Sequence, residues 1–321
     1  MSTITHARAW QRLCEMDDIL ILSHARPDGD AVGSMFALYH ALRQIGKHVR
    51  CEIKDAPGNV RFLLPDAAFA DFPVRYVVTV DVGDYKLLND EYKEKYGADV
   101  ALSIDHHGTN TLFAAETLVD PAAAAASEVL FDLFTLGGVE ITNEIAQCLY
   151  VGLSTDTGCF RFANTTAKTL RTGAALLDAG VDNGRLNAEI FDTKSAAYIA
   201  FEKAAMNALT ICLEGKCAVM VLTQQMYKDA GITETDTHGI KGLPRTIEGV
   251  YAGITVSEHN DGVFHASVRS KEPVNAAEIC AVFGGGGHKY AAGCELGTDR
   301  EEAVRRIIAV TEQRLRESGV L

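Results

Sequence analysis

The chain has 321 residues, 47% of them hydrophobic and 23% charged, with a net charge of −13 at neutral pH. Its length predicts two domains, and its acidity argues against long duplex nucleic acid or an anionic membrane as a partner. Because no secretory leader and no apolar run of about 18 residues is evident, we expect a cytoplasmic protein.

Strand and helix patterns alternate through the first half of the chain. Strands are predicted at 19–22, 49–53, 74–80 and 100–104, and helices at 31–45, about 122–136 and about 143–154. We expect Asp120 to cap the second of these helices and Pro121 to occupy its first turn. Strands that alternate with helices predict an α/β domain with a doubly wound parallel sheet.

The pattern changes near residue 185. Residues 187–210 look largely helical, and hairpin-like strand pairs follow at 208–213 with 218–222 and at 250–256 with 263–268, before a last helix at about 300–316. We therefore predict an N-terminal domain over 1–186, a helical linker over 187–210 and a smaller C-terminal α+β domain over 211–321.

Acidic and histidine residues gather in four short groups in the first domain. The groups are His24 with Asp28 and Asp30, then Asp81, then Asp105 with His106 and His107, and finally Asp156. Taken singly, each has a purely structural alternative as a turn, a helix cap, a loop acid or a hydrogen-bonded histidine pair. The first three groups follow predicted strands, and ligand sites of open α/β sheets lie beyond the carboxyl ends of the strands. We therefore expect the groups to converge.

Converging carboxylates repel one another unless cations lie among them. Mixed histidine and carboxylate ligands suit Mn²⁺, with Zn²⁺, Co²⁺ or Fe²⁺ as alternatives and Mg²⁺ less suited. Asp81, alone at its strand end, is the expected bridge between two ions. His24 and Asp28 would complete one site, and Asp30, Asp156 and one of the two neighbouring histidines the other. The remaining histidine would hold a phosphate or assist the leaving group.

These groups resemble the motifs of the DHH phosphoesterase superfamily. The matching segments are Ser23–Ala31, Val80–Asp81, Asp105–His107 and Ser154–Gly158. The resemblance implies two divalent ions, Mn²⁺ foremost, one held by His24, Asp28 and Asp81 and the other by Asp30, Asp81, His106 and Asp156. It also implies that His107 faces the scissile phosphate and that Asp105 orients a ligand histidine, so the candidate catalytic residues are Asp81, Asp105 and His107.

The second half is similar to the DHHA1 domain through Ser267–Ser270 and Gly284–Gly293. The candidate substrate-binding residues there are Arg269, Ser270, Gly285, Gly286, Gly287 and His288. An arginine offers two donors to a terminal phosphate, and a glycine run lets backbone amides approach an anion. A flexible turn is the structural alternative for the glycine run.

The pair of domains resembles the oligoribonuclease and pAp phosphatase subgroup. The resemblance implies hydrolysis of very short single-stranded RNA, of pApA, or of 3′-phosphoadenosine 5′-phosphate (pAp), with two metal ions activating water. A cyclic di-AMP phosphodiesterase is the alternative, and an inorganic pyrophosphatase or a non-catalytic nucleotide receptor is less favoured. Because no basic run could follow a long phosphate backbone, we expect short substrates. A homodimer is left open.

Overall fold

The computed structural model describes residues 2–54, 56–65, 69–96, 99–234, 237 and 239–321. It divides the chain into two units, Met1–Thr193 and Lys194–Leu321, so the division falls inside the segment 187–210 that the sequence assigned to a linker. Helix α7 (Asn183–Asn187) and a π-helical turn (Ala188–Asp192) lie in the first unit, and helix α8 (Ala196–Asn207) lies in the second.

The first unit contains a six-stranded sheet in the order β1-β6-β5-β4-β2-β3, and every strand pairs in parallel with its neighbours. The strands are β1 (Ser2–Thr3), β2 (Ile19–Leu22), β3 (Val49–Cys51), β4 (Tyr76–Val80), β5 (Val100–Asp105) and β6 (Glu116–Val119). The predicted α/β class is confirmed. The order places β4 between β2 and β5, so the residues that follow these three strands share one edge of the sheet.

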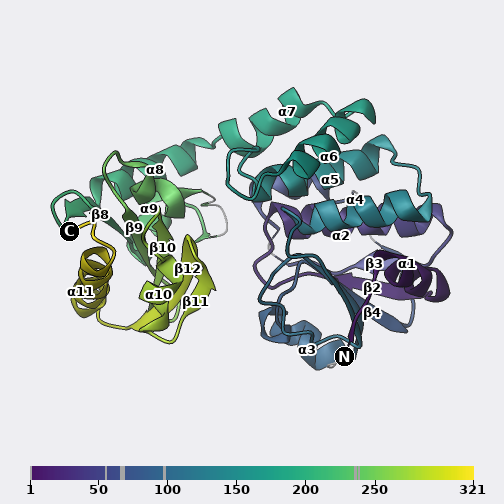
Figure 1. Cartoon of the computed structure of the whole chain (residues 1–321), viewed down its shortest axis with the longest axis horizontal. Coiled ribbons are helices and arrows are strands. Elements are labelled where there is room, and N and C mark those ends of the chain that lie inside the picture. Colours follow the sequence, from purple (N-terminus) through teal and green to yellow (C-terminus); the bar gives the residue numbers. More distant parts are fainter. Residues whose placement is uncertain (1, 55, 66–68, 97–98, 235–236, 238) are drawn as a thin grey trace. The chain divides into compact units, whose positions relative to one another are not determined.

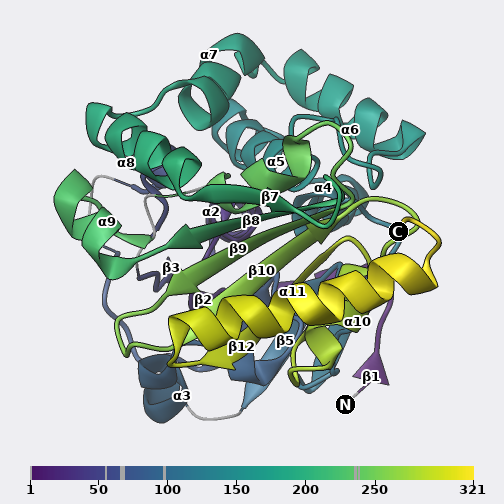
Figure 2. The same cartoon turned by 90° about the vertical axis from the view of Figure 1, so that its left-hand side faces the viewer.

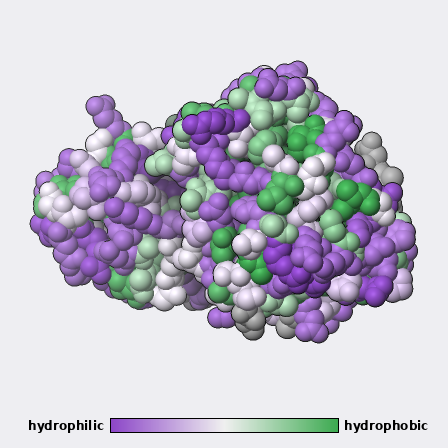
Figure 3. Space-filling view, turned by 45° about the vertical axis from the view of Figure 1, so that its right-hand side comes forward, coloured by the Kyte–Doolittle hydropathy of each residue, from purple (hydrophilic) through white to green (hydrophobic). Residues whose placement is uncertain are grey.

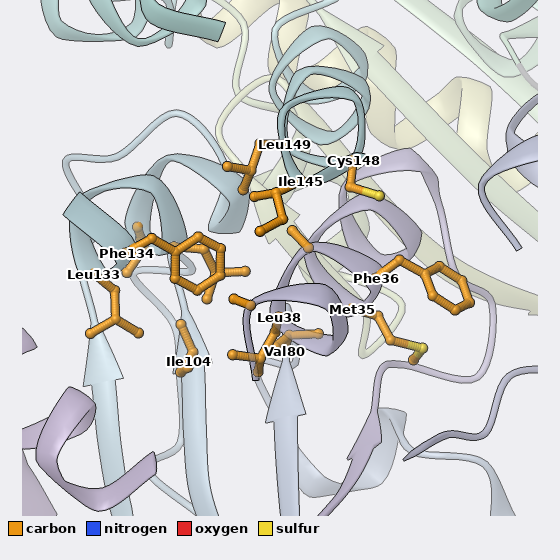
Figure 4. Close-up of a cluster of buried hydrophobic side chains, with 14 of the residues drawn as sticks. Met35, Phe36, Leu38, Val80, Ile104, Leu133, Phe134, Ile145, Cys148 and Leu149 are labelled. Atoms are coloured by element: carbon orange, nitrogen blue, oxygen red, sulfur yellow. The ribbon is translucent and has the colours of Figure 1, made fainter. Parts of the chain in front are cut away.

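Helices cover both faces of this sheet. They are α1 (His6–Glu15), α2 (Gly29–Gln44), α3 (Asp90–Tyr96), α4 (Ala126–Gly137), α5 (Asn143–Asp156) and α6 (Ala167–Asp178), with short 3₁₀ turns at Gly58–Leu63 and Tyr85–Leu87. Helices α2 and α4 lie on one side and α3 on the other (Figure 1). Between the sheet and the first layer, Leu38 of α2, Val80 and Ile104 of the strands and Phe134 of α4 form part of one buried cluster (Figure 4).

Helices α2 and α5 cross at glycines. A Cβ atom on Gly33 would lie 2.4 Å from the carbonyl oxygen of Cys148, and one on Gly152 would lie 2.5 Å from a carboxylate oxygen of Asp30. Only glycine permits an approach this close. The crossing therefore brings the start of α2, with Asp30, close to α5.

The prediction that Asp120 caps a helix beginning at Pro121 is wrong. Helix α4 begins at Ala126, and Asp120 instead accepts a hydrogen bond from the backbone two residues on. The N-terminus of α4 is capped from far along the chain, because the Asp30 carboxylate accepts the backbone N–H groups of Ala126 and Ser127 at 2.6 and 3.1 Å. A cap that distant leaves no local signal at the start of the helix.

The second unit contains a mixed six-stranded sheet in the order β11-β12-β10-β9-β8-β7. Its strands are β7 (Leu209–Cys212), β8 (Cys217–Leu222), β9 (Ala252–Glu258), β10 (Phe264–Ser270), β11 (Gly286–His288) and β12 (Ala291–Gly297). Among the described strands of this second sheet, β8 and β9 pair in parallel and the other neighbours pair antiparallel. The helices after α8 are α9 (Gln224–Ala230), α10 (Ala276–Ala281) and α11 (Arg300–Glu317), with a 3₁₀ segment, η5, at Ile240–Thr246.

Two hydrophobic clusters sandwich this second sheet. One joins its strands to α10 and α11, and the other joins β8 to α8 and α9; Figure 2 shows α11 lying across the strands. The predicted α+β character of the second half is confirmed.

Hydrophilic residues dominate the face seen in Figure 3, with apolar residues in small groups among them. Within the described part of the chain, no helix has the length and apolar character needed to cross a bilayer.

Candidate metal centre and active site

Three neighbouring parallel strands deliver the first three residue groups to one edge of the sheet. His24 follows β2, Asp81 follows β4, and the Asp105–His107 triplet begins at the last residue of β5. Asp156, the last residue of α5, joins them because α5 crosses closely over α2. The structure thus brings together groups that are more than 100 positions apart in the sequence.

Asp81 occupies the centre of the cluster. Its Oδ2 lies 3.6 Å from Nε2 of His24, and its Oδ1 lies 3.6 Å from both Nε2 of His106 and Nδ1 of His107. Its backbone has φ of 57°, a left-handed conformation that non-glycine residues seldom adopt. The two oxygens of one carboxylate therefore face two different sets of side chains, which is the arrangement that a bridging ligand requires.

His24 and Asp28 lie on one side of this carboxylate. Nε2 of His24 is 4.0 Å from Oδ1 of Asp28, and these two residues with Asp81 can converge on one ion. The same Asp28 oxygen accepts the N–H groups of Asp30 and Ala31 as the N-cap of α2. The sequence offered this cap as the structural alternative for Asp30, but Asp28 is the residue that caps α2, and it also belongs to the cluster.

His106 lies on the other side with two carboxylates. Its Nε2 is 3.3 Å from Oδ2 of Asp156 and 4.0 Å from Oδ2 of Asp30, and the three can also converge on an ion. Its Nδ1 lies 3.3 Å from the carbonyl oxygen of Ala123. A ring N–H donated there leaves the Nε2 lone pair directed at the cluster, as a metal ligand needs.

The Asp30 carboxylate is held by a buried network. Besides the two N–H groups of α4, its Oδ1 accepts the hydroxyl of Ser34 at 3.0 Å and the hydroxyl of Ser127, and the two serine oxygens are 2.9 Å apart. Burial, and next the charge of Asp81, raise the pKa of Asp30 to about 6. Oδ2 has one N–H partner and a second lone pair, so it remains available to a cation.

The electrostatics of the cluster favour bound cations. Burial, and then the charge of Asp30, raise the pKa of Asp156 well above its ordinary value. Burial also disfavours charge on Asp81, but His24 and the other two histidines outweigh it and lower the pKa of Asp81. Its Oδ1 is buried and has no hydrogen-bond donor among the described residues. A buried, unpartnered carboxylate oxygen among other acids fits divalent ions.

His107 is engaged differently from His106. Its Nδ1 lies 2.8 Å from Oδ1 of Asp105, and Oδ2 of Asp105 accepts the side-chain amide of Asn110 at 2.6 Å. The hydrogen bond with Asp105 raises the pKa of His107 to about 9. Asp105 therefore contacts His107 and not the expected ligand His106. Sequence reasoning missed Asn110, whose role depends on a contact five residues away in a loop.

Comparison with known proteins decides the family. The DHH family, N-terminal domain, matches residues 18–153, and the DHHA1 domain matches residues 215–317. The bifunctional oligoribonuclease and PAP phosphatase NrnA of Thermus thermophilus is 33% identical over 98% of this chain and 98% of its own. The chain belongs to the DHH/DHHA1 phosphoesterase family. It is therefore a phosphoric ester hydrolase, as the sequence predicted.

Two further relatives extend the comparison. The crystal structure of an exopolyphosphatase-related protein from Bacteroides fragilis has a TM-score of 0.86 at 24% identity, covers 98% of this chain and 97% of its own, and shows the same fold. The cyclic-di-AMP phosphodiesterase GdpP of Geobacillus thermodenitrificans is 26% identical over 98% of this chain, which spans 49% of that protein.

A cavity of about 640 Å³ opens onto the cluster of acidic and histidine residues in the DHH unit. Besides the acidic and histidine residues, Arg26 and Lys86 line it together with the exposed Leu87. The backbone N–H of Ala25 donates to the carbonyl of Leu87 at 2.7 Å and fastens the two loops to each other. The sequence analysis assigned no role to Arg26, although it lies within the Ser23–Ala31 segment, and it missed Lys86, because only the folded loops bring Lys86 beside that segment.

The DHHA1 unit places the predicted substrate-binding residues on its sheet. Arg269 is half-buried on β10, and its Nη1 donates to the carbonyl of Val268 at 3.2 Å. Ser270 is buried, and its hydroxyl donates to the carbonyl of Val274 at 2.8 Å, so the side chain holds the end of β10 in place. His288 is exposed at the end of the edge strand β11.

The glycine run, Gly284–Gly287, leads into β11, the edge strand that pairs with β12. A Cβ atom on Gly285 would lie 2.2 Å from the carbonyl of Gly293, and one on Gly287 would lie 2.6 Å from the carbonyl of Ala291. Both glycines are therefore needed for the close approach of β12. A Cβ on Gly286 would meet open space, so the backbone is exposed at that position.

Proposed function

We propose that this phosphoesterase hydrolyses short nucleotide substrates with two divalent ions, Mn²⁺ foremost. The proposed substrates are oligoribonucleotides of a few nucleotides, pApA and pAp. The name of the Thermus thermophilus relative states an oligoribonuclease and PAP phosphatase, and the likeness covers 98% of both chains. That full-length likeness supports the same substrate class here.

The observation that carries the proposal is the Asp81 carboxylate, whose two oxygens face separate ligand sets. One ion would be held by His24, Asp28 and Asp81, and the other by Asp30, Asp81, His106 and Asp156. When bound, the ions would supply an activated water and positive charge for phosphoester hydrolysis. The chain's own residues orient the ligands, since Ala123, Ser34 and Ser127 fix their ring and carboxylate positions.

His107 and Asp105 supply the proton chemistry in this proposal. Asp105 accepts from Nδ1 of His107, which orients the ring at the edge of the cavity. A histidine with a raised pKa holds its proton near neutral pH and can donate it to the leaving oxygen. Asn110 fixes the carboxylate of Asp105.

In the DHHA1 domain, we assign Arg269, Gly285, Gly286, Gly287 and His288 to binding of the substrate's terminal nucleotide. The guanidinium would pair with a phosphate, and the exposed Gly286 backbone would lie against it. Ser270 would act by positioning, because its hydroxyl is occupied by Val274. A local grip on one end of the substrate, without a long basic groove, favours short chains.

Cyclic di-AMP is the second candidate substrate. The chain is 26% identical to the cyclic-di-AMP phosphodiesterase GdpP over 98% of its length, although it spans only 49% of that protein. Cyclic di-AMP has two phosphodiesters and no terminal phosphate, so it would not use a terminal-phosphate contact.

A substrate panel tests the proposal. Purified protein with Mn²⁺ would be given pAp, pApA, trinucleotide RNA and cyclic di-AMP, with Asp81→Ala as the matched inactive control. We expect kcat/KM to be highest on pAp, pApA or the trinucleotide. Turnover of cyclic di-AMP alone would replace the first candidate with the second, and turnover of none would reject both.

A further inference from the structure

A row of residues crosses the second sheet on one face. His288 of β11 is the register partner of Ala291 of β12, Ala291 is the partner of Arg269 of β10, and Arg269 is the partner of Gly253 of β9. Directly opposed residues of antiparallel strands point to the same side of a sheet. His288 and Arg269 therefore share a face, with only the small side chain of Ala291 between them.

A second arginine lies over the end of this row. A Cβ atom on Gly253 would lie 2.3 Å from the backbone nitrogen of Arg245 and 2.8 Å from its Cα. Because that Cβ would point to the same face as Arg269, the η5 segment crosses the sheet there and places Arg245 beside Arg269. The pKa of Arg269 is lowered, first by burial of its side chain and next by the positive charge of Arg245.

No carboxylate of the described residues forms an ion pair with either guanidinium, and both side chains are half-buried. Nε of Arg245 is buried without a hydrogen-bond partner in the same part of the chain. Two adjacent, partly desolvated positive charges repel each other, and a buried unpaired donor carries a desolvation cost. A chain with a net charge of −13 has many acids that could neutralise such a pair, yet none of those described is placed there. The arrangement is suited to an anion from outside.

We propose that Arg245 and Arg269 together bind the terminal 5′-phosphate of the substrate, with His288 at the other side of Arg269. A terminal phosphate monoester carries up to two negative charges, whereas an internal diester carries one, so a pair of arginines distinguishes them. Arg245 is then a residue that sets preference for 5′-phosphorylated substrates. This inference rests on the proposed function, which assigns Arg269 to the same phosphate.

The test compares substrates that differ only in that phosphate. Arg245→Gln, Arg269→Gln and the control Arg300→Gln, which removes the same charge from an exposed site, would be assayed on pApA and on ApA with Mn²⁺. We expect the ratio of kcat/KM for pApA to that for ApA to fall at least about 10-fold in the first two variants, mainly through KM. The control should keep the wild-type ratio.

A binding measurement separates this inference from the proposed function. Calorimetric titration with AMP and with adenosine needs no turnover, and Arg245→Gln should weaken AMP binding at least about 10-fold while Arg300→Gln does not. Arg245→Lys keeps the positive charge but lacks the paired donors of the guanidinium, so it should recover part of the lost AMP affinity. A wild-type protein that binds AMP but cleaves no substrate would reject the proposed function alone. Unchanged AMP binding in a folded Arg245→Gln protein would overturn the inference.

Discussion

Removal of the metal ions should make the stability of the DHH unit fall as pH rises. The pKa of Asp30 is about 6 in the folded protein against an ordinary 3.8. A carboxyl whose pKa is raised by folding stabilises the fold while both states are protonated, and that stability is lost as pH rises through the folded pKa. Between about pH 4.5 and about pH 7.5 the loss from Asp30 is roughly 1.5 units at 1.36 kcal/mol each, or on the order of 2 kcal/mol.

The pKa shifts of the neighbouring groups determine the pH range over which stability should be measured. The pKa values of Asp156 and His107 are also raised, so their contributions fall with rising pH in the same sense. The pKa of Asp81 is lowered, so its contribution is present above its ordinary value of 3.8 and is lost only at more acidic pH. A range that begins near pH 4.5 therefore excludes the opposing effect of Asp81.

The assay is urea unfolding of chelator-treated protein, followed by the fluorescence of Trp10. Trp10 is the single tryptophan of the chain and packs against Gly137 in the first unit, so it reports that unit. Adding Mn²⁺ at about pH 7.5 should restore stability, because the ions neutralise the same carboxylates. Asp156→Asn should flatten the pH slope, whereas the exposed control Asp178→Asn should not. Metal-free protein that is as stable at about pH 7.5 as at about pH 4.5 would show that the raised pKa of Asp30 does not govern the stability of this unit.

Three further outcomes follow from the same geometry. Asp81→Ala should abolish turnover on every substrate and lower the number of bound Mn²⁺ ions, and near-normal kcat would exclude a bridging role. Ser127→Ala removes one hydrogen bond to Asp30 and should weaken Mn²⁺ binding about 10-fold, at about 1.4 kcal/mol; calorimetry with Thr135→Ala as a surface control would show whether affinity is unchanged. On single-stranded RNA from dinucleotides to about 24-mers, kcat/KM should fall steeply with length, and equal efficiency on the longest would indicate a groove that holds long chains.

The sequence predicted those parts of the molecule that depend on local pattern. Short apolar runs marked the strands, and His24, Asp81 and the Asp105–His107 triplet could be placed at strand ends because each follows such a run directly. The order of strands that sets Asp81 between the other two groups depends on pairing between distant segments, and so was not predicted from the runs themselves.

The missed features depend on contacts between distant segments. Asp30 accepts a hydrogen bond from Ser127, 97 positions away in the sequence. Because of this contact, α4 begins at Ala126 and not at the predicted Pro121. Arg245 lies beside Arg269 only because Gly253 lets η5 cross the sheet. Neither Ser127 nor Arg245 lies in a sequence motif that would distinguish it from an ordinary surface residue.

Anomalous diffraction from crystals grown with Mn²⁺ would show directly whether Asp81 bridges two ions. We expect two manganese peaks, with Asp81 ligating both, His24 and Asp28 at one ion, and Asp30, His106 and Asp156 at the other. A single peak, or two peaks of which Asp81 contacts only one, would contradict the two-ion centre on which the proposed hydrolysis depends.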